Sequence, residues 1–470
     1  MITLVLISAL AAPDRSAPPP VIPPSPLELP EPTVQVLRPG LSVHHVAIPG
    51  ARKVGVRVHF GLGAIELAQR HSPLIDAYNA LIDVATLDLD EDALALATDE
   101  LDLSLWATLD LHDAVFSLDA PVDALDDALP LLAGILHTPA FTGSELRRFK
   151  VETRYNLLNE LPTSPSGLIN TVVEYLRYPA SHPYSEVPDL KAVRRVSRRD
   201  LRSLHASLIR SAPLKVLVTG DLSAERAAEL ALRVARDAGV PAERPPAIPA
   251  PPIASFRAVG VHLPAQQQAG LYVQTGAPPY TADDAVPFAA VNYALGGAFL
   301  SRLNRNLRED KGFTYGIRSM WVPTEVDGTW VASTDVAAAN AGAAISEMLA
   351  EIAIIARGGP TEDEIDAGYL DAVSGWNETL RTGPGAASAY LRQLRRDESA
   401  AEARARLLDW QSLDPAAAAT AARAWLGEPQ HQLWTLLGDR AVLEPQLRAL
   451  GWDVTWIEAA PAALGELEEP

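Results

Sequence analysis

The sequence predicts an α+β protein made of two duplicated domains, each a mainly antiparallel sheet with helices packed on one face. Strand-like and helix-like patterns interleave within each half of the chain, which is typical of this fold class. An Ala- and Pro-rich stretch, Val240–Pro252, separates the halves, and proline continues neither a helix nor a central strand. We therefore expect two domains of similar length, joined by this Pro-rich linker and facing each other across a cleft.

Short motifs repeat across the linker at a nearly constant offset. The sequence LVTGD at Leu217–Asp221 recurs as TLLGD at Thr435–Asp439. Thr142 is followed three residues on by Glu, and the same pair returns at Thr361, with nearly the same offset. Threonine with Glu at this spacing forms a capping box at a helix N-terminus. The repeats therefore predict equivalent strands and equivalent capped helices in the two halves.

Hydrophobic periodicity places the individual elements. In the first half, apolar residues alternate with more polar ones over Leu101–Leu111, which is the period of a half-buried strand. Asp113–Asp119 is the expected hairpin partner, and Val122–Leu136 is the expected amphipathic helix. In the second half, Gly328–Val336 and Ala343–Ala356 are predicted as the matching strand and helix.

The N-terminus has features of an export signal. Ile2–Ala11 is almost wholly apolar, too short to span a bilayer but as long as a signal-peptide core, and it ends on a small-x-small cleavage pattern. The usual basic segment is missing, so the alternative is an apolar start of a cytosolic protein. The predicted organisation is a signal peptide at 1–12, a Pro-rich spacer at 13–32, an N-terminal domain at 33–239, an Ala/Pro-rich linker at 240–254, a C-terminal domain at 255–460 and an acidic tail at 461–470.

The composition excludes several classes of function. Lys and Arg number 39 against 59 Asp and Glu, a net charge of −20 that disfavours binding to phosphate backbones or anionic lipid. Without cysteine, the chain has no disulfide, thiolate nucleophile or Cys-ligated metal. No apolar run approaches the roughly 18 residues of a membrane span. We expect neither nucleic acid as a partner nor a membrane-spanning segment.

Few residues could hold a metal. The chain has ten histidines, and no two stand four residues apart, the spacing that places two ligands on one helix face. His44 and His45 are adjacent on a predicted strand, so their rings point to opposite faces of the sheet. The acidic run Asp88–Asp92 lacks the EF-hand pattern and is interpreted as a solvated loop.

The segment Leu295–Tyr315 reads LGGAFLSRLNRNLREDKGFTY. It closely resembles the second-domain signature of the M16 family, the pitrilysin/insulinase-like zinc peptidases and mitochondrial-processing-peptidase-like proteins. The resemblance extends over roughly residues 33–460 and includes the triplet His182–Tyr184. The residues that match the signature are Gly296, Gly297, Ser301, Arg302, Leu303, Leu307, Arg308, Glu309, Gly312 and Tyr315.

In that family, the first domain carries a His-x-x-Glu-His motif and a third zinc ligand, a Glu, much farther along the chain. Two imidazoles and a carboxylate hold the metal, and the Glu of the motif is the general base. The matching positions here are Asp76, Asn79 and Ala80, and the family's spacing puts the third-ligand position at Leu157. Asn79 cannot accept a proton from water, and neither Ala80 nor Leu157 can coordinate zinc. The resemblance therefore implies a degenerate zinc motif.

Arg308 and Tyr315 match two second-domain residues that act in active M16 clefts. There, the Tyr hydroxyl is positioned for the oxyanion of the tetrahedral intermediate, and the Arg for substrate carbonyl groups. Preorganised donors of this kind are typically worth about 2.7–4 kcal/mol each. The alternative is that Tyr315 is an amphipathic core residue and Arg308 belongs to a surface ion pair.

Some M16 members are heterodimers in which one subunit binds zinc and the other supplies the Arg/Tyr pair. The resemblance implies that this chain is of the second kind: a non-catalytic, substrate-binding subunit of an exported M16B-type peptidase, periplasmic in a Gram-negative bacterium. It would hold no cofactor, with zinc in the partner subunit, and would bind peptide or unfolded polypeptide as an added strand on a sheet edge. One alternative is an M16-like scaffold or peptide-binding protein with no peptidase role. Another, an autonomous metallopeptidase, requires ligands that the sequence lacks.

Overall fold

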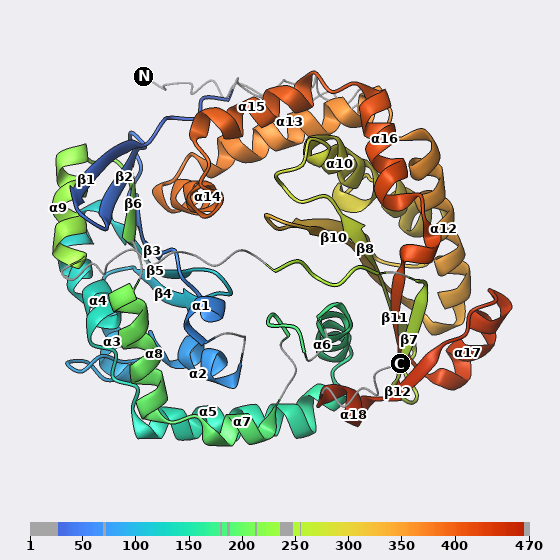
Figure 1. Cartoon of the computed structure of the whole chain (residues 1–470), viewed down its shortest axis with the longest axis horizontal. Helices are drawn as coiled ribbons and strands as arrows, with labels where there is room; N and C mark the ends of the chain where they lie inside the picture. Colours follow the sequence, from blue (N-terminus) through green and yellow to red (C-terminus); the bar gives the residue numbers. More distant parts are fainter. Residues whose placement is uncertain are drawn as a thin grey trace, which may run out of the picture.

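The computed structural model describes residues 27–68, 72–178, 181–185, 189–211, 214–235, 248–253 and 255–464. The signal peptide expected at 1–12 lies outside these residues, as do most of the spacer and linker and the end of the acidic tail. Seen along its shortest axis, the molecule has a ring-like outline, with the first half on the left and the second half on the right (Figure 1).

The first half is built on a six-stranded sheet with the strand order β1-β2-β6-β3-β5-β4. β2 and β6 run parallel, and the other neighbouring strands are antiparallel. Its elements are β1 (Thr33–Arg38), β2 (Leu41–Ala47), β3 (Lys53–Phe60), α1 (Ala64–Ala68), α2 (Pro73–Leu81), α3 (Glu91–Glu100), β4 (Ser104–Leu109), β5 (Ala114–Pro121), α4 (Leu125–His137), α5 (Gly143–Tyr155), α6 (Pro165–Arg177), α7 (Leu190–Arg195), α8 (Arg198–Ser211), β6 (Leu214–Gly220) and α9 (Ala224–Val234).

The second half repeats this sheet in the order β12-β7-β11-β8-β10-β9. β7 runs parallel to β11 and β12, and the remaining pairs are antiparallel. Its elements are β7 (Arg257–His262), β8 (Gln268–Ala277), α10 (Ala285–Asn292), α11 (Arg302–Asn304), β9 (Ile317–Pro323), β10 (Gly328–Ala337), α12 (Ala341–Gly358), α13 (Glu362–Thr379), α14 (Gly383–Arg396), α15 (Ala400–Gln411), α16 (Pro415–Leu426), β11 (Leu433–Gly438), α17 (Arg440–Ala449), β12 (Thr455–Glu458) and α18 (Ala459–Ala463).

The duplicated α+β architecture expected from the sequence is confirmed. Each sheet packs helices of its own half on one face and forms a hydrophobic core there. Both predicted capping boxes are present, at Thr142 on α5 and at Thr361 on α13. The strand predicted over Leu101–Leu111 is shorter, because α3 runs to Glu100 and Asp102 takes the left-handed conformation (φ 52°) in the turn before β4.

The two halves exchange one helix each. α6 of the first half packs against β8 and β11 of the second sheet, and α14 of the second half packs against β3 and β6 of the first sheet (Figure 1). α6 begins at Pro165 and α14 at Gly383, with the same offset as the LVTGD and TLLGD repeat, so the two helices are equivalent. Each covers part of the face that the helices of the other half leave open, which joins the halves through two further hydrophobic clusters.

One helix among the described residues is long and apolar enough to cross a membrane, Ala338–Gly358, which contains α12. Its buried residues, such as Ile345, Met348 and Ile352, belong to the hydrophobic core under the second sheet. Its apolar composition is therefore accounted for by packing inside this half.

Candidate functional site at Arg308 and Tyr315

Arg308 lies on a short turn that two buried leucines anchor. The turn, η5 (Arg305–Asp310), has π-helical winding, a local geometry found frequently at functional sites. Leu303 and Leu307 are completely buried in the core of the second half. The signature segment therefore buries Leu303 and Leu307 and presents Arg308 at the surface of the turn.

The loop that carries Tyr315 is held by its neighbours. The hydroxyl of Thr314 donates a hydrogen bond to the carbonyl oxygen of Gly316, at 2.9 Å. The hydroxyl oxygen of Thr334, on β10, lies 2.8 Å from that of Thr314 and 2.9 Å from the same carbonyl oxygen. The side chain of Tyr315 is nevertheless 92% exposed. An aromatic side chain thus projects into solvent from a hydrogen-bonded backbone, and Tyr315 is not the core residue of the alternative interpretation.

Arg308 lies between two exposed aromatic rings. Its guanidinium carbon is 4.6 Å from the ring centroid of Phe299 and 5.4 Å from that of Tyr315, both within the range of a cation–π interaction. Its Nε is also 3.2 Å from a carboxylate oxygen of Glu309, so the expected surface ion pair exists. Phe299 and Leu300 are 67% and 63% exposed. Apolar side chains exposed together around an arginine are typical of an interaction surface.

Phe299, Arg308 and Tyr315 border a cavity of about 630 Å³ between the second half and the exchanged helix α6. That volume lies within the range of roughly 300–1,000 Å³ that is usual for ligand sites. α6 contributes Ser166, Ile169 and Asn170, and the second half contributes Gln268, Gly270, Leu271, Tyr272, Gly297, Ala298, Phe299, Asn304, Arg308, Thr314, Tyr315, Gly316, Ile317, Arg318, Ser333, Thr334 and Asp335.

Two titratable groups that line this cavity have shifted pKa values. Burial raises the pKa of the Asp335 carboxyl and also that of the Tyr272 hydroxyl. Desolvation disfavours the charged form of an acid, so both groups stay protonated to higher pH than they would in water. The cavity therefore combines a half-buried cation, Arg308, with partly buried, weakly acidic groups.

The three replaced positions of the zinc motif share one face of α2. Asp76 and Ala80 are exposed and Asn79 is half-buried, whereas Tyr78 and Leu81 point into the first core. This is the arrangement that the resemblance implies for a metal-binding helix. None of the three lines the cavity at Arg308 and Tyr315.

Asn79 is a structural residue rather than a base. Its amide nitrogen donates to the carbonyl oxygen of Leu109 at 3.0 Å, and its carbonyl oxygen accepts from the N–H of Leu109 at 2.7 Å. One turn later, the carboxylate of Asp83 accepts from the N–H of Ala107 at 3.0 Å. Leu109 and Ala107 belong to β4, the edge strand of the first sheet. The side chains of α2 and of the turn after it therefore occupy outward-facing backbone groups of this edge.

The second sheet has a similar contact at its own edge strand, β9. Asn304 donates to the carbonyl oxygen of Ile317 at 2.8 Å and accepts from its N–H at 3.0 Å. An added peptide strand would need such outward-facing groups for its own hydrogen bonds. At β4 and β9, a peptide that added to the sheet edge would therefore compete with a side chain of this chain for the same backbone groups.

Leu157 packs in a different hydrophobic cluster from the buried residues of α2. It is 8% exposed and belongs to the cluster that joins α6 to the second sheet, with Val261, Leu437 and other apolar residues. Asn79 and its neighbours lie instead over the first core. Within the described residues, the structure gives no group of three His, Asp or Glu side chains that could hold a metal ion.

The other candidate ligands have structural roles. His44 and His45 lie on β2, as expected, with His44 half-buried and His45 buried. In the acidic run, Asp90 caps α3 by accepting from the N–H of Ala93, and Glu91 pairs with Arg148. The acidic residues of this run are exposed, but the expected loop is only partly correct, because Glu91 and Asp92 form the first turn of α3.

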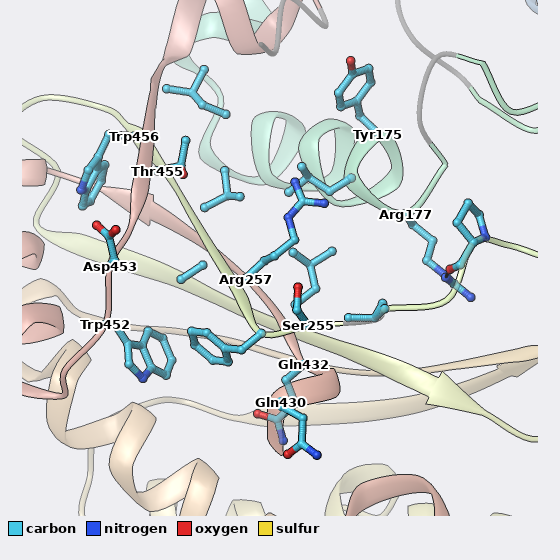
Figure 2. Close-up of a pocket in the computed structure, with 18 of the residues that line it drawn as sticks. Tyr175, Arg177, Ser255, Arg257, Gln430, Gln432, Trp452, Asp453, Thr455 and Trp456 are labelled. Carbon is cyan, nitrogen blue, oxygen red and sulfur yellow. Dashed lines mark hydrogen bonds between the residues drawn. The ribbon is translucent and has the colours of Figure 1, made fainter. Parts of the chain in front are cut away.

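A larger cavity, about 1300 Å³, lies elsewhere, where β7 and β12 meet the C-terminal end of α6. Figure 2 shows Arg257 pointing into it between Thr455 and Tyr175, with Trp452 and Trp456 on one side. None of the residues that the sequence singled out as site residues lines this cavity.

Sequence reasoning missed Phe299, Leu300 and Asn304 although all three lie inside the signature segment. Phe299 and Leu300 could have been found as two large apolar residues next to the Gly pair, without a place in a helical or strand period. The role of Asn304 depends on a contact with β9 and leaves no local pattern.

Comparison with known proteins relates part of the chain to a described family. Residues 195–368 match the family model of the peptidase M16 inactive domain. The matched residues run from the end of α7 into α13 and contain the whole signature segment Leu295–Tyr315. No curated protein sequence matches the chain.

Solved structures share the fold over most of the chain. A peptidase M16 inactive domain from Pseudomonas fluorescens is 21% identical, with a TM-score of 0.69 over 87% of this chain and 98% of its own. A protease from Helicobacter pylori is 16% identical, with a TM-score of 0.75 over 87% of this chain and 100% of its own. The periplasmic protease PqqL from Escherichia coli is 14% identical, with a TM-score of 0.73. The match includes 92% of this chain but only 49% of PqqL. The two-domain fold is therefore M16-like, and the family-model match is to an inactive domain.

Proposed function

We propose that this chain is the non-catalytic, substrate-binding subunit of a heterodimeric M16B-type peptidase and that it supplies Arg308 and Tyr315 to the site of a zinc-bearing partner. The observation that carries the proposal is the exposure of Tyr315. Its side chain, which bears the hydroxyl, is 92% exposed, and the loop that holds it is fixed by hydrogen bonds. The rings of Phe299 and Tyr315 are both exposed beside Arg308, and apolar groups exposed together mark an interaction site.

The relation to PqqL supports an incomplete site in this chain. Nearly all of the chain corresponds to about half of that protease. An assembly of the same size would therefore need a second subunit beside this one. The replaced zinc positions Asp76, Asn79, Ala80 and Leu157 fit the subunit that holds no metal.

In the complex, zinc held by the partner would supply the Lewis acid for peptide-bond hydrolysis. The hydroxyl of Tyr315 would donate a hydrogen bond to the oxygen that becomes negative in the tetrahedral intermediate. Arg308 would hold carbonyl groups of the bound peptide. Asn79, Asp83 and Asn304 already bond to the edge strands β4 and β9, so the peptide would pair with another strand, which in this proposal belongs to the partner.

The proposal includes export to the periplasm of a Gram-negative bacterium. It is supported by the apolar run Ile2–Ala11 and by the periplasmic location of PqqL. N-terminal sequencing of the native protein tests this part: a start near Ala12 is expected, and an intact Met1 in a cytosolic fraction contradicts it.

Kinetics of the purified complex test the role of the pair. Tyr315→Phe should lower kcat on the order of 100-fold with little change in KM, because the donor acts on charge that develops mainly in the transition state. Arg308→Ala should also raise KM, because Arg308 would hold the substrate in the ground state. Tyr155→Phe, at an exposed tyrosine on α5, is the matched control and should leave both constants unchanged.

Assembly must be measured alongside the kinetics. Both site variants should still co-purify with the zinc-bearing subunit, so that a lost activity reports on chemistry. If both variants keep the kinetics of the wild-type complex, the pair is structural and the scaffold hypothesis replaces this proposal.

A further inference from the structure

The cavity of about 1300 Å³ where β7 and β12 meet the C-terminal end of α6 has a strongly aromatic lining. Four aromatic side chains line it, with several leucines, isoleucines and prolines beside them: Tyr175, Phe256, Trp452 and Trp456. None of its lining residues borders the cavity at Arg308 and Tyr315. Its volume exceeds the roughly 300–1,000 Å³ that is usual for ligand sites, so a small organic molecule fits within part of it.

Arg257 presents an unpaired cation to this cavity. It points into the cavity from the start of β7 (Figure 2). Its side chain is half-buried, and its guanidinium makes no hydrogen bond or ion pair within the described residues. The other arginine of the lining, Arg177, instead donates to the hydroxyl of Thr329 and to the carbonyl oxygen of Pro251. Arg257 therefore offers several N–H donors to the cavity, and these donors lack acceptors there.

Two carboxylates also line the cavity, but neither pairs with Arg257 within the described residues. Asp453 and Glu458 are both exposed. Figure 2 shows Asp453 beside Trp452 and Trp456, away from the guanidinium. The C-terminal end of α6 favours a nearby cation through the helix dipole, but this attraction supplies no acceptor for the individual N–H groups. The guanidinium is therefore available to an anion from outside the chain.

The duplicated fold does not require a cation at this position. Arg257 pairs with Leu433 on β11, five residues before the glycine of TLLGD. In the first half, Ser42 pairs with Lys215 on β6, five residues before the glycine of LVTGD. The equivalent position on β2 thus holds a small neutral side chain, so Arg257 is a feature of this cavity and not of the repeated sheet.

We propose that this cavity binds an aromatic carboxylate, a small molecule with one negative charge and a flat apolar body. The carboxylate would accept paired hydrogen bonds from Arg257, because the fork of guanidinium donors matches the two carboxylate oxygens. The rings would lie against the aromatic side chains that line the cavity.

Other classes of small molecule match the lining less well. A neutral apolar molecule would leave the guanidinium of Arg257 without an acceptor, and an inorganic anion would leave the aromatic side chains in contact with water. The site lies within this chain and does not depend on the role proposed for Arg308 and Tyr315, so it is testable without a partner subunit.

Calorimetric titration of the purified chain with 1-naphthaleneacetate tests the proposal. Saturable binding with a Kd below about 1 mM is expected. The alcohol 1-naphthaleneethanol has the same rings without the charge and should bind at least about tenfold more weakly. Acetate, which has the charge without the rings, should show no saturable binding up to about 10 mM.

Variants locate the site. Arg257→Gln removes the charge and the paired donors, and it should weaken the binding of 1-naphthaleneacetate by about tenfold or more. Arg440→Gln is the matched control, because it removes the same charge close by. The guanidinium carbon of Arg440 is 5.7 Å from the ring centroid of Trp456, but Arg440 does not line the cavity. This variant should keep the wild-type affinity.

Three results would overturn the proposal. They are no saturable binding of 1-naphthaleneacetate to the wild-type chain, equal affinity for the carboxylate and the alcohol, and an equal loss of affinity in Arg440→Gln and Arg257→Gln. The first two are measured on the wild-type chain, so they decide the matter even if Arg257→Gln does not fold.

Discussion

At the scale of the residue, Asn79 and Tyr315 differ most clearly in what their side chains contact. Asn79 stands where the M16 motif has its base, and its amide joins α2 to the edge of the first sheet. Tyr315 keeps an exposed ring on a fixed loop. The first domain thus uses Asn79 to hold the fold together, while the second domain exposes the ring of Tyr315 to solvent.

A buried histidine makes stability depend on pH. His205 packs among Tyr78, Phe116 and Phe141, and burial lowers its pKa to about 4. In the unfolded chain its pKa returns to about 6.5, so between these values the unfolded state binds more protons. The free energy of unfolding should therefore fall as the pH is lowered from about 6.5 towards 4.

The contribution of His205 is measured by urea unfolding at pH 7 and pH 5. One such group accounts for a loss of roughly 2 kcal/mol over this interval. Phenylalanine at this position cannot be protonated. Between pH 7 and pH 5, the free energy of unfolding of His205→Phe should therefore fall by roughly 2 kcal/mol less than that of the wild type. An equal loss in the variant would place the pH dependence on other groups, of which His44 is the next candidate because burial lowers its pKa to about 4.

At the scale of the element, the exchange of α6 and α14 is the main feature that the sequence did not predict. The capping boxes, the repeated LVTGD strand and the helix α12 could be predicted, because each depends on residues close together in the chain. The packing of α14 on β3 joins segments from opposite halves of the sequence. The burial of Leu157 has the same origin, since it follows from the contact of α6 with the second sheet.

Close packing of α14 on the first sheet requires a glycine in β3. A Cβ atom at Gly55 would lie 2.6 Å from the Cβ of Ala387 and 3.0 Å from the carbonyl oxygen of Gly383. Gly55→Ala should therefore lower the free energy of unfolding by about 1–3 kcal/mol through overpacking. Gly375→Ala is the control, because a Cβ at that helical glycine would have no atom within 4 Å. This substitution should raise the free energy of unfolding by about 0.5–1 kcal/mol. If Gly55→Ala and Gly375→Ala have equal effects in thermal unfolding, α14 does not pack closely on β3.

The third zinc-ligand position cannot be restored without damage to the fold. Leu157→Glu would place a carboxylate in the cluster between α6 and the second sheet, and it should cost at least the roughly 2–5 kcal/mol typical of losing a buried leucine. Leu158→Glu, at a leucine that is 41% exposed, should have little effect. Denaturant unfolding of the two variants decides this. If Leu157→Glu is as stable as the control, the first domain has kept room for a metal ligand.

At the scale of the whole molecule, the chain corresponds to about half of a longer M16-like protease, and each of its two domains packs against a helix of the other. The fold class was predictable from the sequence, since the repeat that underlies it is visible in one chain. The exposure of Tyr315 and its contact with Arg308 were not, because they depend on how the loop after η5 packs on β10.

The central claim is that this chain completes the site of a zinc-bearing partner, and reconstitution measures it most directly. The partner alone, with its zinc, should hydrolyse peptide slowly, and adding the wild-type chain should raise its kcat until the two are equimolar. The chain alone should contain no stoichiometric zinc and show no hydrolysis. Stimulation on the order of 100-fold is expected, and Tyr315→Phe should remove most of it without weakening the complex. A partner that is fully active alone, or a chain that carries chelatable zinc and hydrolyses peptide by itself, would contradict the account.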